Sequence, residues 1–151
     1  GVERSAAQQY IDRYFSRYPG VANYMDRSKN QAKELGYVET VFGRRLTLPE
    51  IHASNHQLRQ AAERAAINAP MQGTAADLIK IAMIAVNCWL REEGLKTNII
   101  MQVHDELILE TPEEELELIL REVPQRMAAI AKLNVPLVAD IGSGINWDQA
   151  H

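Results

Sequence analysis

The chain has 151 residues, of which 46% are hydrophobic and 24% charged, a composition typical of one ordinary globular domain. No apolar run approaches the ~18 residues of a membrane-spanning helix, no signal peptide opens the chain, and a single cysteine excludes a disulfide framework. We therefore expect a cytoplasmic protein with no membrane partner and with Cys88 reduced in the core. The net charge of −4 argues weakly against nucleic-acid binding, but it is uneven: +3 over residues 1–100 and −7 over 101–151.

Two helices are expected at the amino-terminal end. Ser5 and Gln8 form a capping-box pattern at the start of the first helix. Apolar residues then recur at the spacing of one helical face: Ala7, Tyr10, Ile11, Tyr14, Phe15 and Tyr18. Pro19 ends this helix and suits the first position of a second helix, and Gly36 suits the position just past the end of that second helix.

The middle of the chain predicts a hairpin and two further helices. Residues 37–48 have the pattern of a short hairpin with a glycine in its turn. An alanine-rich helix over 54–72 must end or kink at Pro70, which has no N–H to donate to the carbonyl four residues earlier. Thr74 is then expected to cap a new helix over 75–93, which is apolar nearly all round and therefore buried.

The last third of the chain predicts strands around one helix. Residues 97–103 and 106–111 have the composition of a strand pair. Residues 112–133 predict a helix kinked at Pro124. A last strand is expected over 135–144.

Together these elements predict an α+β fold, in which helices pack on a small, mostly antiparallel sheet. We expect a mainly helical segment, 1–94, which contains the hairpin at 37–48. A second segment, 95–151, would contain the strand pair, one helix and the final strand. No change of composition marks a linker between the two segments.

The densest cluster of ionisable residues, His104, Asp105 and Glu106, interrupts the strand-like stretch IIMQVHDELILE. At a hairpin turn neighbouring side chains can point the same way, so Asp105 and Glu106 could converge on one divalent cation. Carboxylate oxygens suit Mg²⁺, and the chemistry implied is metal-assisted phosphoryl transfer. The alternative is a purely structural hairpin tip, although such tips usually contain Gly or Asn, and neither is present here.

A second polar cluster lies on the alanine-rich helix. Arg64, Asn68 and Gln72 are four residues apart, so they share one helix face, which we call the polar face. Arginine binds phosphate bidentately and amides donate to sugar and base edges, so the polar face is a candidate nucleic-acid contact. Arg59 and the arginines at 44–45 could extend it along a nucleic-acid backbone. The alternative is a solvent-facing stripe without a ligand.

Several long segments, taken together, closely resemble the carboxyl-terminal part of the polymerase domain of bacterial family A DNA polymerases. They follow one another over nearly the whole chain: YFSRYPGVANYM, GYVETVFGRRLTLP, ERAAINAPMQGTAADLIK, IIMQVHDELILE and GSGINWDQAH. The resemblance implies that residues 1–94 belong to the fingers side of such an enzyme and residues 95–151 to its palm side.

The resemblance also implies roles for both clusters. In the family, the residue matching Asp105 is a ligand of two catalytic Mg²⁺ ions, for which Mn²⁺ can substitute, and Glu106 is an accessory carboxylate. His104 lies near the primer terminus. The polar face matches residues that contact the template–primer duplex in its minor groove, where nearly uniform acceptors let donors check base-pair geometry. The incoming dNTP is the other expected partner.

The family's pattern is incomplete in this chain. It lacks a second metal-binding aspartate from an earlier palm strand and the fingers helix that binds dNTP, and we expect the chain to begin just after that helix. Leu58 stands beside Arg59 where some relatives have two adjacent arginines, which weakens the basic track. We therefore expect a polymerase of the bacterial cytoplasm and nucleoid whose amino-terminal part is a required partner. The isolated chain is expected to show no primer extension.

Two other functions are compatible with the residues alone. One is a non-catalytic helical module that binds DNA or a protein partner through the polar face. The other is a small metal-dependent nuclease that combines Asp105 and Glu106 with a histidine, namely His52, His56 or His104. Nuclease sites usually bring together more acidic ligands than this sequence offers.

Overall fold

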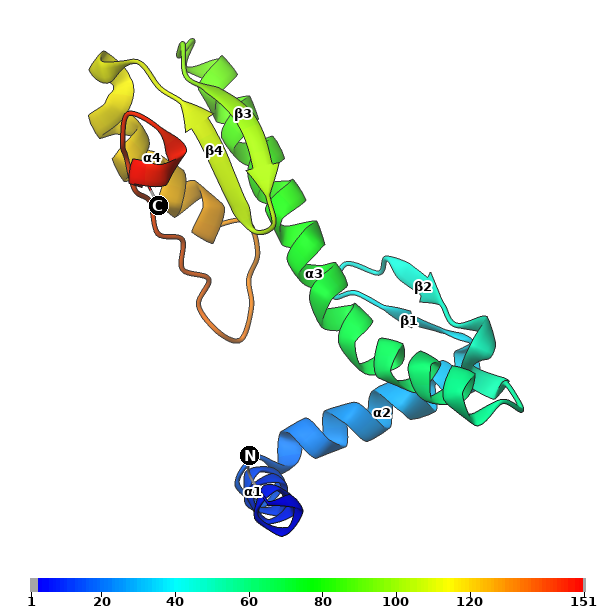
Figure 1. Ribbon diagram of the computed structural model, residues 1–151. Helices are drawn as coiled ribbons and strands as arrows, with labels where there is room; N and C mark the ends of the chain where they lie inside the picture. The colour runs from blue at the N-terminus through cyan, green and yellow to red at the C-terminus, as the bar shows by residue number, and fades with distance from the viewer. Residues whose placement is uncertain (1–2, 151) are drawn as a thin grey trace. The chain divides into compact units, whose positions relative to one another are not determined.

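The computed structural model describes residues 3–150, which form helices and two small antiparallel hairpins (Figure 1). The α+β fold expected from the sequence is confirmed. The chain divides into two compact units, one ending at Thr74 and the other starting at Ala75, and each contains its own hydrophobic core. The boundary expected after residue 94 separates two functional segments. The division into compact units does not test it, and it stays a prediction.

The first helix, α1 (Arg4–Arg17), has no side-chain cap at its start. Ser5 Oγ instead donates to Glu3 Oε2 at 3.4 Å, and Gln8 Nε2 donates to Asp12 Oδ1 at 2.9 Å. The predicted capping box is therefore wrong, because both side chains bond to nearby carboxylates. The helix buries none of its side chains, and three of its large apolar residues, Tyr10, Ile11 and Tyr14, are exposed.

The second helix, α2 (Pro19–Leu35), has the boundaries that proline and glycine predict. Pro19 occupies the first helical position, where its missing N–H is not needed. Gly36 follows the last turn with φ 74°, a left-handed conformation that costs glycine nothing. Its carbonyl accepts a 2.8 Å hydrogen bond from the backbone N–H of Leu48, which returns the hairpin to the end of the helix.

The first hairpin pairs β1 (Tyr37–Glu39) with β2 (Arg45–Thr47), as predicted for residues 37–48. A short 3₁₀ helix, η1 (Pro49–His52), follows it. The core of the first unit lies between these elements, the end of α2 and the start of α3, and its buried members are Ala32, Val38, Leu48, Ile51, Ala62 and Ala66. The alanines allow the helices to approach each other closely.

The third helix, α3 (His56–Glu92), continues through Pro70 without a break. The predicted restart at residue 75 is therefore wrong. Thr74 does not cap a new helix but lies inside α3, where its Oγ1 donates to the carbonyl of Pro70 at 2.6 Å. Tertiary contacts described below hold this turn of the helix in spite of the missing N–H.

The carboxyl-terminal half of α3 is less buried than its composition predicts. Val86, Trp89 and Leu90 are buried, but Ile84 is 55% exposed and Cys88 is also exposed. The expected core position of Cys88 is therefore wrong. By length and composition alone, α3 is also long and apolar enough to span a membrane, and its most apolar 18-residue window has a mean hydropathy of 1.3. This is weak evidence, because core helices of soluble proteins pass the same test.

The second unit contains the predicted strand pair, β3 (Asn98–Val103) and β4 (Glu106–Glu110), with an irregularity of register between Ile99 and Met101. A 3₁₀ turn, η2 (Glu113–Glu115), leads into α4 (Leu116–Ala128). One face of the hairpin packs on α3 and α4 (Figure 1). The buried members of this core are Val86, Trp89, Leu90, Ile119 and Val123, with Ile99 and Leu109 of the hairpin packed against them.

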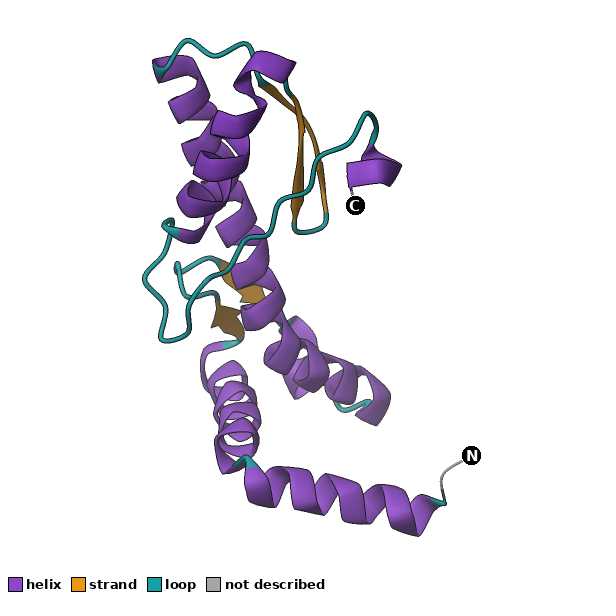
Figure 2. Cartoon of the chain, turned by 90° about the vertical axis from the view of Figure 1, so that its left-hand side faces the viewer, coloured by secondary structure: helices purple, strands orange, loops and turns teal. Residues whose placement is uncertain are grey.

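The end of the chain differs most from the prediction. Helix α4 ends at Ala128 rather than near residue 133, and Pro124 lies inside it. Among the described residues, 135–144 pair with no strand, so the predicted last strand is wrong; Figure 2 shows this segment as loop. A strand forms only where a neighbour completes its hydrogen-bond ladder. A short helix, α5 (Trp147–Ala150), ends the described chain.

Candidate metal turn and nucleic-acid interface

The turn between β3 and β4 consists of His104 and Asp105. Strand pairing brings Val103 opposite Glu106, which leaves only these two residues to reverse the chain. His104 has φ 52°, a left-handed conformation that is uncommon for residues other than glycine. Gln102 Nε2 donates to the carbonyl of His104 at 2.8 Å and so closes the turn. Sequence reasoning missed Gln102, whose only signal was its place two residues before the cluster.

The two candidate metal ligands occupy different environments at this turn. Asp105 is exposed at the tip, whereas Glu106 is the first residue of β4 and is partly buried. The hairpin behind them is anchored by Ile99 and Leu109, which pack on the core of the second unit. One carboxylate on the turn and one at the first position of β4 are oxygen ligands of the kind that Mg²⁺ uses, and this ion keeps several of its waters and needs few protein ligands.

No group of three or more His, Cys, Asp or Glu side chains that could hold a metal occurs within residues 3–150. The turn therefore supplies only part of a coordination sphere. The nuclease hypothesis needed a histidine beside the two carboxylates and gains no support. His52 has another partner, since its Nε2 lies 2.9 Å from the carbonyl of Lys33 near the end of α2.

The polar face of α3 is presented to solvent by the first unit. Arg64, Asn68 and Gln72 are all exposed, while Ala62 and Ala66 on the other side of the helix are buried in the core. The alternation follows from the 3.6-residue period of the helix. Three side chains with hydrogen-bond donors thus lie in a row along a surface whose reverse side is fixed by packing.

The acidic residue next to Arg64 is neutralised by an ion pair. Lys33 Nζ lies 2.8 Å from Glu63 Oε1, and this hydrogen bond with Lys33 holds the pKa of the Glu63 carboxyl below its usual value. Glu63 therefore remains ionised but paired, and its charge opposes an approaching phosphate less than an unpaired carboxylate would. This arrangement favours an anionic ligand at Arg64.

The other arginines of the predicted basic track are engaged with the protein. Arg59 Nη1 donates to the carbonyl of Ala53 at 2.9 Å, and Arg44 Nη2 donates to the carbonyl of Gly73 at 2.9 Å. Arg45 Nε bonds a carboxylate of β1 at 2.7 Å. The basic track is thus less available to a ligand than the sequence indicates.

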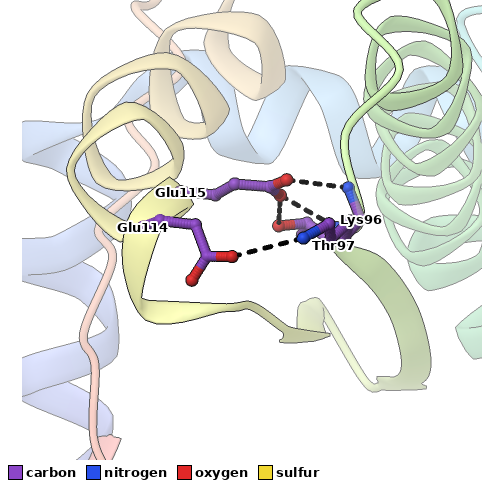
Figure 3. Close-up of polar contacts among 4 residues, drawn as sticks. All are labelled: Lys96, Thr97, Glu114 and Glu115. Carbon is purple, nitrogen blue, oxygen red and sulfur yellow. Dashed lines mark hydrogen bonds and ion pairs between the residues drawn. The ribbon is translucent and has the colours of Figure 1, made fainter.

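A group of hydrogen bonds fixes the two residues just before β3 to η2 (Figure 3). The carboxylate of Glu115 accepts from the backbone N–H groups of Lys96 and Thr97, at 2.8 and 2.9 Å, and from Thr97 Oγ1 at 2.6 Å. These donors, the Lys96 N–H first and the Thr97 hydroxyl next, lower the pKa of the Glu115 carboxyl. Glu114 makes only a 3.4 Å contact with Lys96 Nζ. Sequence reasoning did not single out Glu115 within its acidic run.

Comparison with known proteins gives consistent matches over the chain. The family model "DNA polymerase family A" matches residues 1–149. DNA polymerase I of Pseudomonas aeruginosa is 60% identical over 151 residues, and that of Streptococcus pneumoniae 47% identical over 150 residues. The chain spans only 16% and 17% of the lengths of these two relatives.

A solved structure matches at the level of the fold. It is the POL domain of Pol1 from M. smegmatis in complex with DNA primer–template and dNTP, and it is 44% identical with a TM-score of 0.95. The match covers 99% of this chain and 26% of the solved one.

Proposed function

The chain belongs to DNA polymerase family A, and from this premise we propose that it forms part of a template-directed DNA polymerase. Its contribution would be a carboxylate turn for a catalytic metal ion and a helix face for the template–primer duplex. The observation that carries the proposal is the match, at a TM-score of 0.95 over 99% of the chain, to a polymerase domain that holds primer–template and dNTP. DNA and dNTP are the proposed partners here too.

The polar face of α3 is the proposed duplex contact. Arg64, Asn68 and Gln72 offer donors on an exposed, well-anchored helix, which suits the acceptors that line the minor groove. Because these acceptors differ little among base pairs, the contact would test the geometry of the pair without selecting sequence. Arg59 and His104 are proposed as weaker contacts, Arg59 because its guanidinium already bonds the carbonyl of Ala53.

The turn at Asp105 and Glu106 is the proposed metal site. The exposed Asp105 carboxylate would ligate the ion directly, with Glu106 beside it as an accessory carboxylate. When bound, Mg²⁺ or Mn²⁺ would act as a Lewis acid in nucleotidyl transfer. The role of the chain is to hold these oxygens in place, and the Gln102 bond to the turn and the packed hairpin support that role. A second ion would require carboxylates beyond the two that this turn offers.

The rest of the catalytic machinery is proposed to lie in polypeptide outside these 151 residues. The relatives are about six times longer than the segment that matches this chain, which supports that assignment. Family membership supports divalent-metal dependence, and bacterial relatives support a place in the cytoplasm, at the nucleoid. The proposed boundary between fingers-side residues 1–94 and palm-side residues 95–151 belongs to the same hypothesis.

A non-catalytic DNA- or partner-binding module is the second candidate. It is favoured because all three residues of the polar face are exposed on the described chain. The carboxylates at 105 and 106, by contrast, belong to no group of three or more possible metal ligands among the described residues. The two candidates differ in one testable respect. Only the polymerase hypothesis requires the turn to bind a divalent ion.

The test uses two readouts on the 151-residue chain. Fluorescence anisotropy with a short duplex should give a dissociation constant of about 10⁻⁴–10⁻⁶ M, the range of non-specific DNA binding. Arg64→Ala should weaken it about tenfold, roughly the loss of one good polar contact. Paramagnetic Mn²⁺ should broaden the NMR signals of the Asp105 and Glu106 amides, and Asp105→Asn should abolish this broadening.

Each variant is the control for the other readout. Arg64→Ala should keep the Mn²⁺ broadening, and Asp105→Asn should keep duplex binding. Duplex binding without any Mn²⁺ effect at the turn would favour the non-catalytic module. Primer extension by the isolated chain, lost in Asp105→Asn, would contradict the proposal that other segments are required.

A further inference from the structure

The turn of the first hairpin is bonded to α3 directly beside the polar face. Arg44 Nη2 donates to the carbonyl of Gly73 at 2.9 Å, and the backbone N–H of Val41 donates to Thr74 Oγ1 at 3.1 Å. Both acceptors follow Gln72, the last residue of the polar face. The hairpin therefore fixes the helix turn from which Gln72 projects.

This is also the turn that Pro70 weakens. Without an N–H, Pro70 cannot form the usual hydrogen bond to the carbonyl of Ala66, and its ring crowds the preceding turn. Thr74 Oγ1 donates to the carbonyl of Pro70 itself and accepts from the backbone N–H of Val41. One hydroxyl thus links the hairpin turn to the defect in the helix.

Close packing at Gly73 supports the same arrangement. A Cβ added at Gly73 would lie 2.7 Å from Thr40 Cγ2 and 3.3 Å from Arg44 Nη2. Thr40 is itself held in the turn, since its Oγ1 accepts from the backbone N–H of Arg44 at 3.2 Å. Only the absence of a side chain at Gly73 allows the hairpin to approach the helix so closely.

We propose that Arg44 is a positioning residue for duplex binding: through the Gly73 carbonyl it holds the Pro70-weakened turn of α3 so that Asn68 and Gln72 project in register with Arg64. The inference rests on the proposed function of the polar face. The sequence alone suggests that Arg44 contacts a phosphate of the nucleic-acid backbone. The structure instead supports a contact between Arg44 and the helix. Its guanidinium reaches the helix backbone, and the effect on DNA passes through the helix.

The neighbouring arginine provides a matched control. Arg45 has the same charge, but its Nε bonds Glu39 Oε1 at 2.7 Å and its guanidinium lies 4.4 Å from the ring centre of Tyr37. Both partners belong to β1, so Arg45 makes its contacts within the hairpin. Arg45→Ala removes one positive charge without removing the bond to α3.

The experiment measures duplex affinity by anisotropy over a range of salt concentrations for the whole chain and for Arg44→Ala, Arg44→Lys and Arg45→Ala. Loss of one hydrogen bond of ordinary strength predicts about fivefold weaker binding for Arg44→Ala at every salt concentration. The slope of log K against log salt should not change, whereas loss of a phosphate contact would reduce it by about 0.9. Of the two alanine variants, only Arg44→Ala should speed hydrogen exchange at the amides of residues 71–76.

Arg44→Lys separates charge from geometry if the alanine variant folds poorly. Lysine keeps the charge but not the planar fork that reaches the Gly73 carbonyl, so affinity should stay reduced. Full affinity in Arg44→Lys, a changed salt slope in Arg44→Ala, or equal losses in Arg44→Ala and Arg45→Ala would each overturn the inference. Absence of duplex binding by the unsubstituted chain would overturn the proposed function, and this inference with it.

Discussion

At the scale of single residues, one carboxylate does more than its neighbours to hold the second unit together. Glu115 accepts three hydrogen bonds from Lys96 and Thr97, while Glu114, one residue earlier, contacts this segment through Lys96 Nζ at 3.4 Å. The side chains of the Lys96–Glu114 pair are 75% and 67% exposed, and such exposed pairs contribute little. The anchor of β3 on η2 therefore depends on Glu115.

We predict that Glu115 makes the stability of the chain depend on pH. Its folded-state pKa is lowered from 4.5, because backbone and hydroxyl donors favour the carboxylate. The stabilisation is thus fully present above pH 4.5 and is lost as the pH falls through the folded-state pKa. Glu115→Gln should lower the free energy of unfolding at pH 7 and flatten its dependence on pH below 4.5, as measured by urea unfolding.

Glu114→Gln is the control for that experiment. The pKa of Glu114 is also lowered, first by its own backbone N–H and then by Lys96, but Glu114 accepts no bond from the backbone N–H groups of Lys96 and Thr97. Its substitution should change stability at pH 7 much less than Glu115→Gln does. An equal loss from both variants would show that the acidic charge of the run, and not the Glu115 hydrogen bonds, is responsible.

At the scale of elements, helix boundaries depend on where glycine and proline stand relative to the backbone. Gly36 ends α2 in a left-handed conformation, and nothing lies within 4 Å of a Cβ built there. Gly20, near the start of the same helix, also has open space around it but does not have a positive φ. A Cβ would meet no neighbouring atom at either position, so the two glycines differ only in the conformation of their backbone.

We predict opposite effects from the same substitution at these two glycines. Gly36→Ala should destabilise the chain by about 1–2 kcal/mol, the cost of a Cβ in the left-handed region. Gly20→Ala should stabilise it by about 0.5–1 kcal/mol, because alanine loses less conformational freedom than glycine in a helix. Thermal and urea unfolding of both variants would measure this. Losses of similar size would contradict the backbone explanation.

At the scale of the whole molecule, stability comes from two separate cores. Ile51 is 1% exposed in the core of the first unit, and Ile119 is 2% exposed in that of the second. No residue belongs to both clusters of buried side chains among those described. A cavity in one core should therefore be felt mainly in its own unit.

We predict that Ile51→Ala and Ile119→Ala each cost about 2–5 kcal/mol, the usual range for truncation of a buried isoleucine. Hydrogen exchange resolved along the chain should accelerate before residue 75 in the first variant and after it in the second. Ile84→Ala, at a site that is 55% exposed, should change stability by no more than about 0.5 kcal/mol. Uniform acceleration in both core variants would mean that the units unfold as one.

The candidate site was predictable to the extent that it is local. The turn at His104 and Asp105 and the exposed face of Arg64, Asn68 and Gln72 lie where spacing and turn chemistry predict. The roles assigned to these residues remain proposals. Gln102 and Glu115 were not predicted, because their importance comes from partners that spacing does not reveal.

Neighbouring residues were enough to predict the start of α2 at Pro19, its end at Gly36, and both hairpins. Local backbone chemistry is sufficient for these, since each is stabilised within a few residues. The passage of α3 through Pro70 could not be predicted in this way, because a distant hairpin turn bonds the helix at Gly73 and Thr74. The same holds for residues 135–144, which have strand composition but no ladder partner among the described residues. The cause is similar in both cases: a strand outside a hairpin forms only where another segment completes its ladder, and a helix turn weakened by proline is held by contacts from outside the helix.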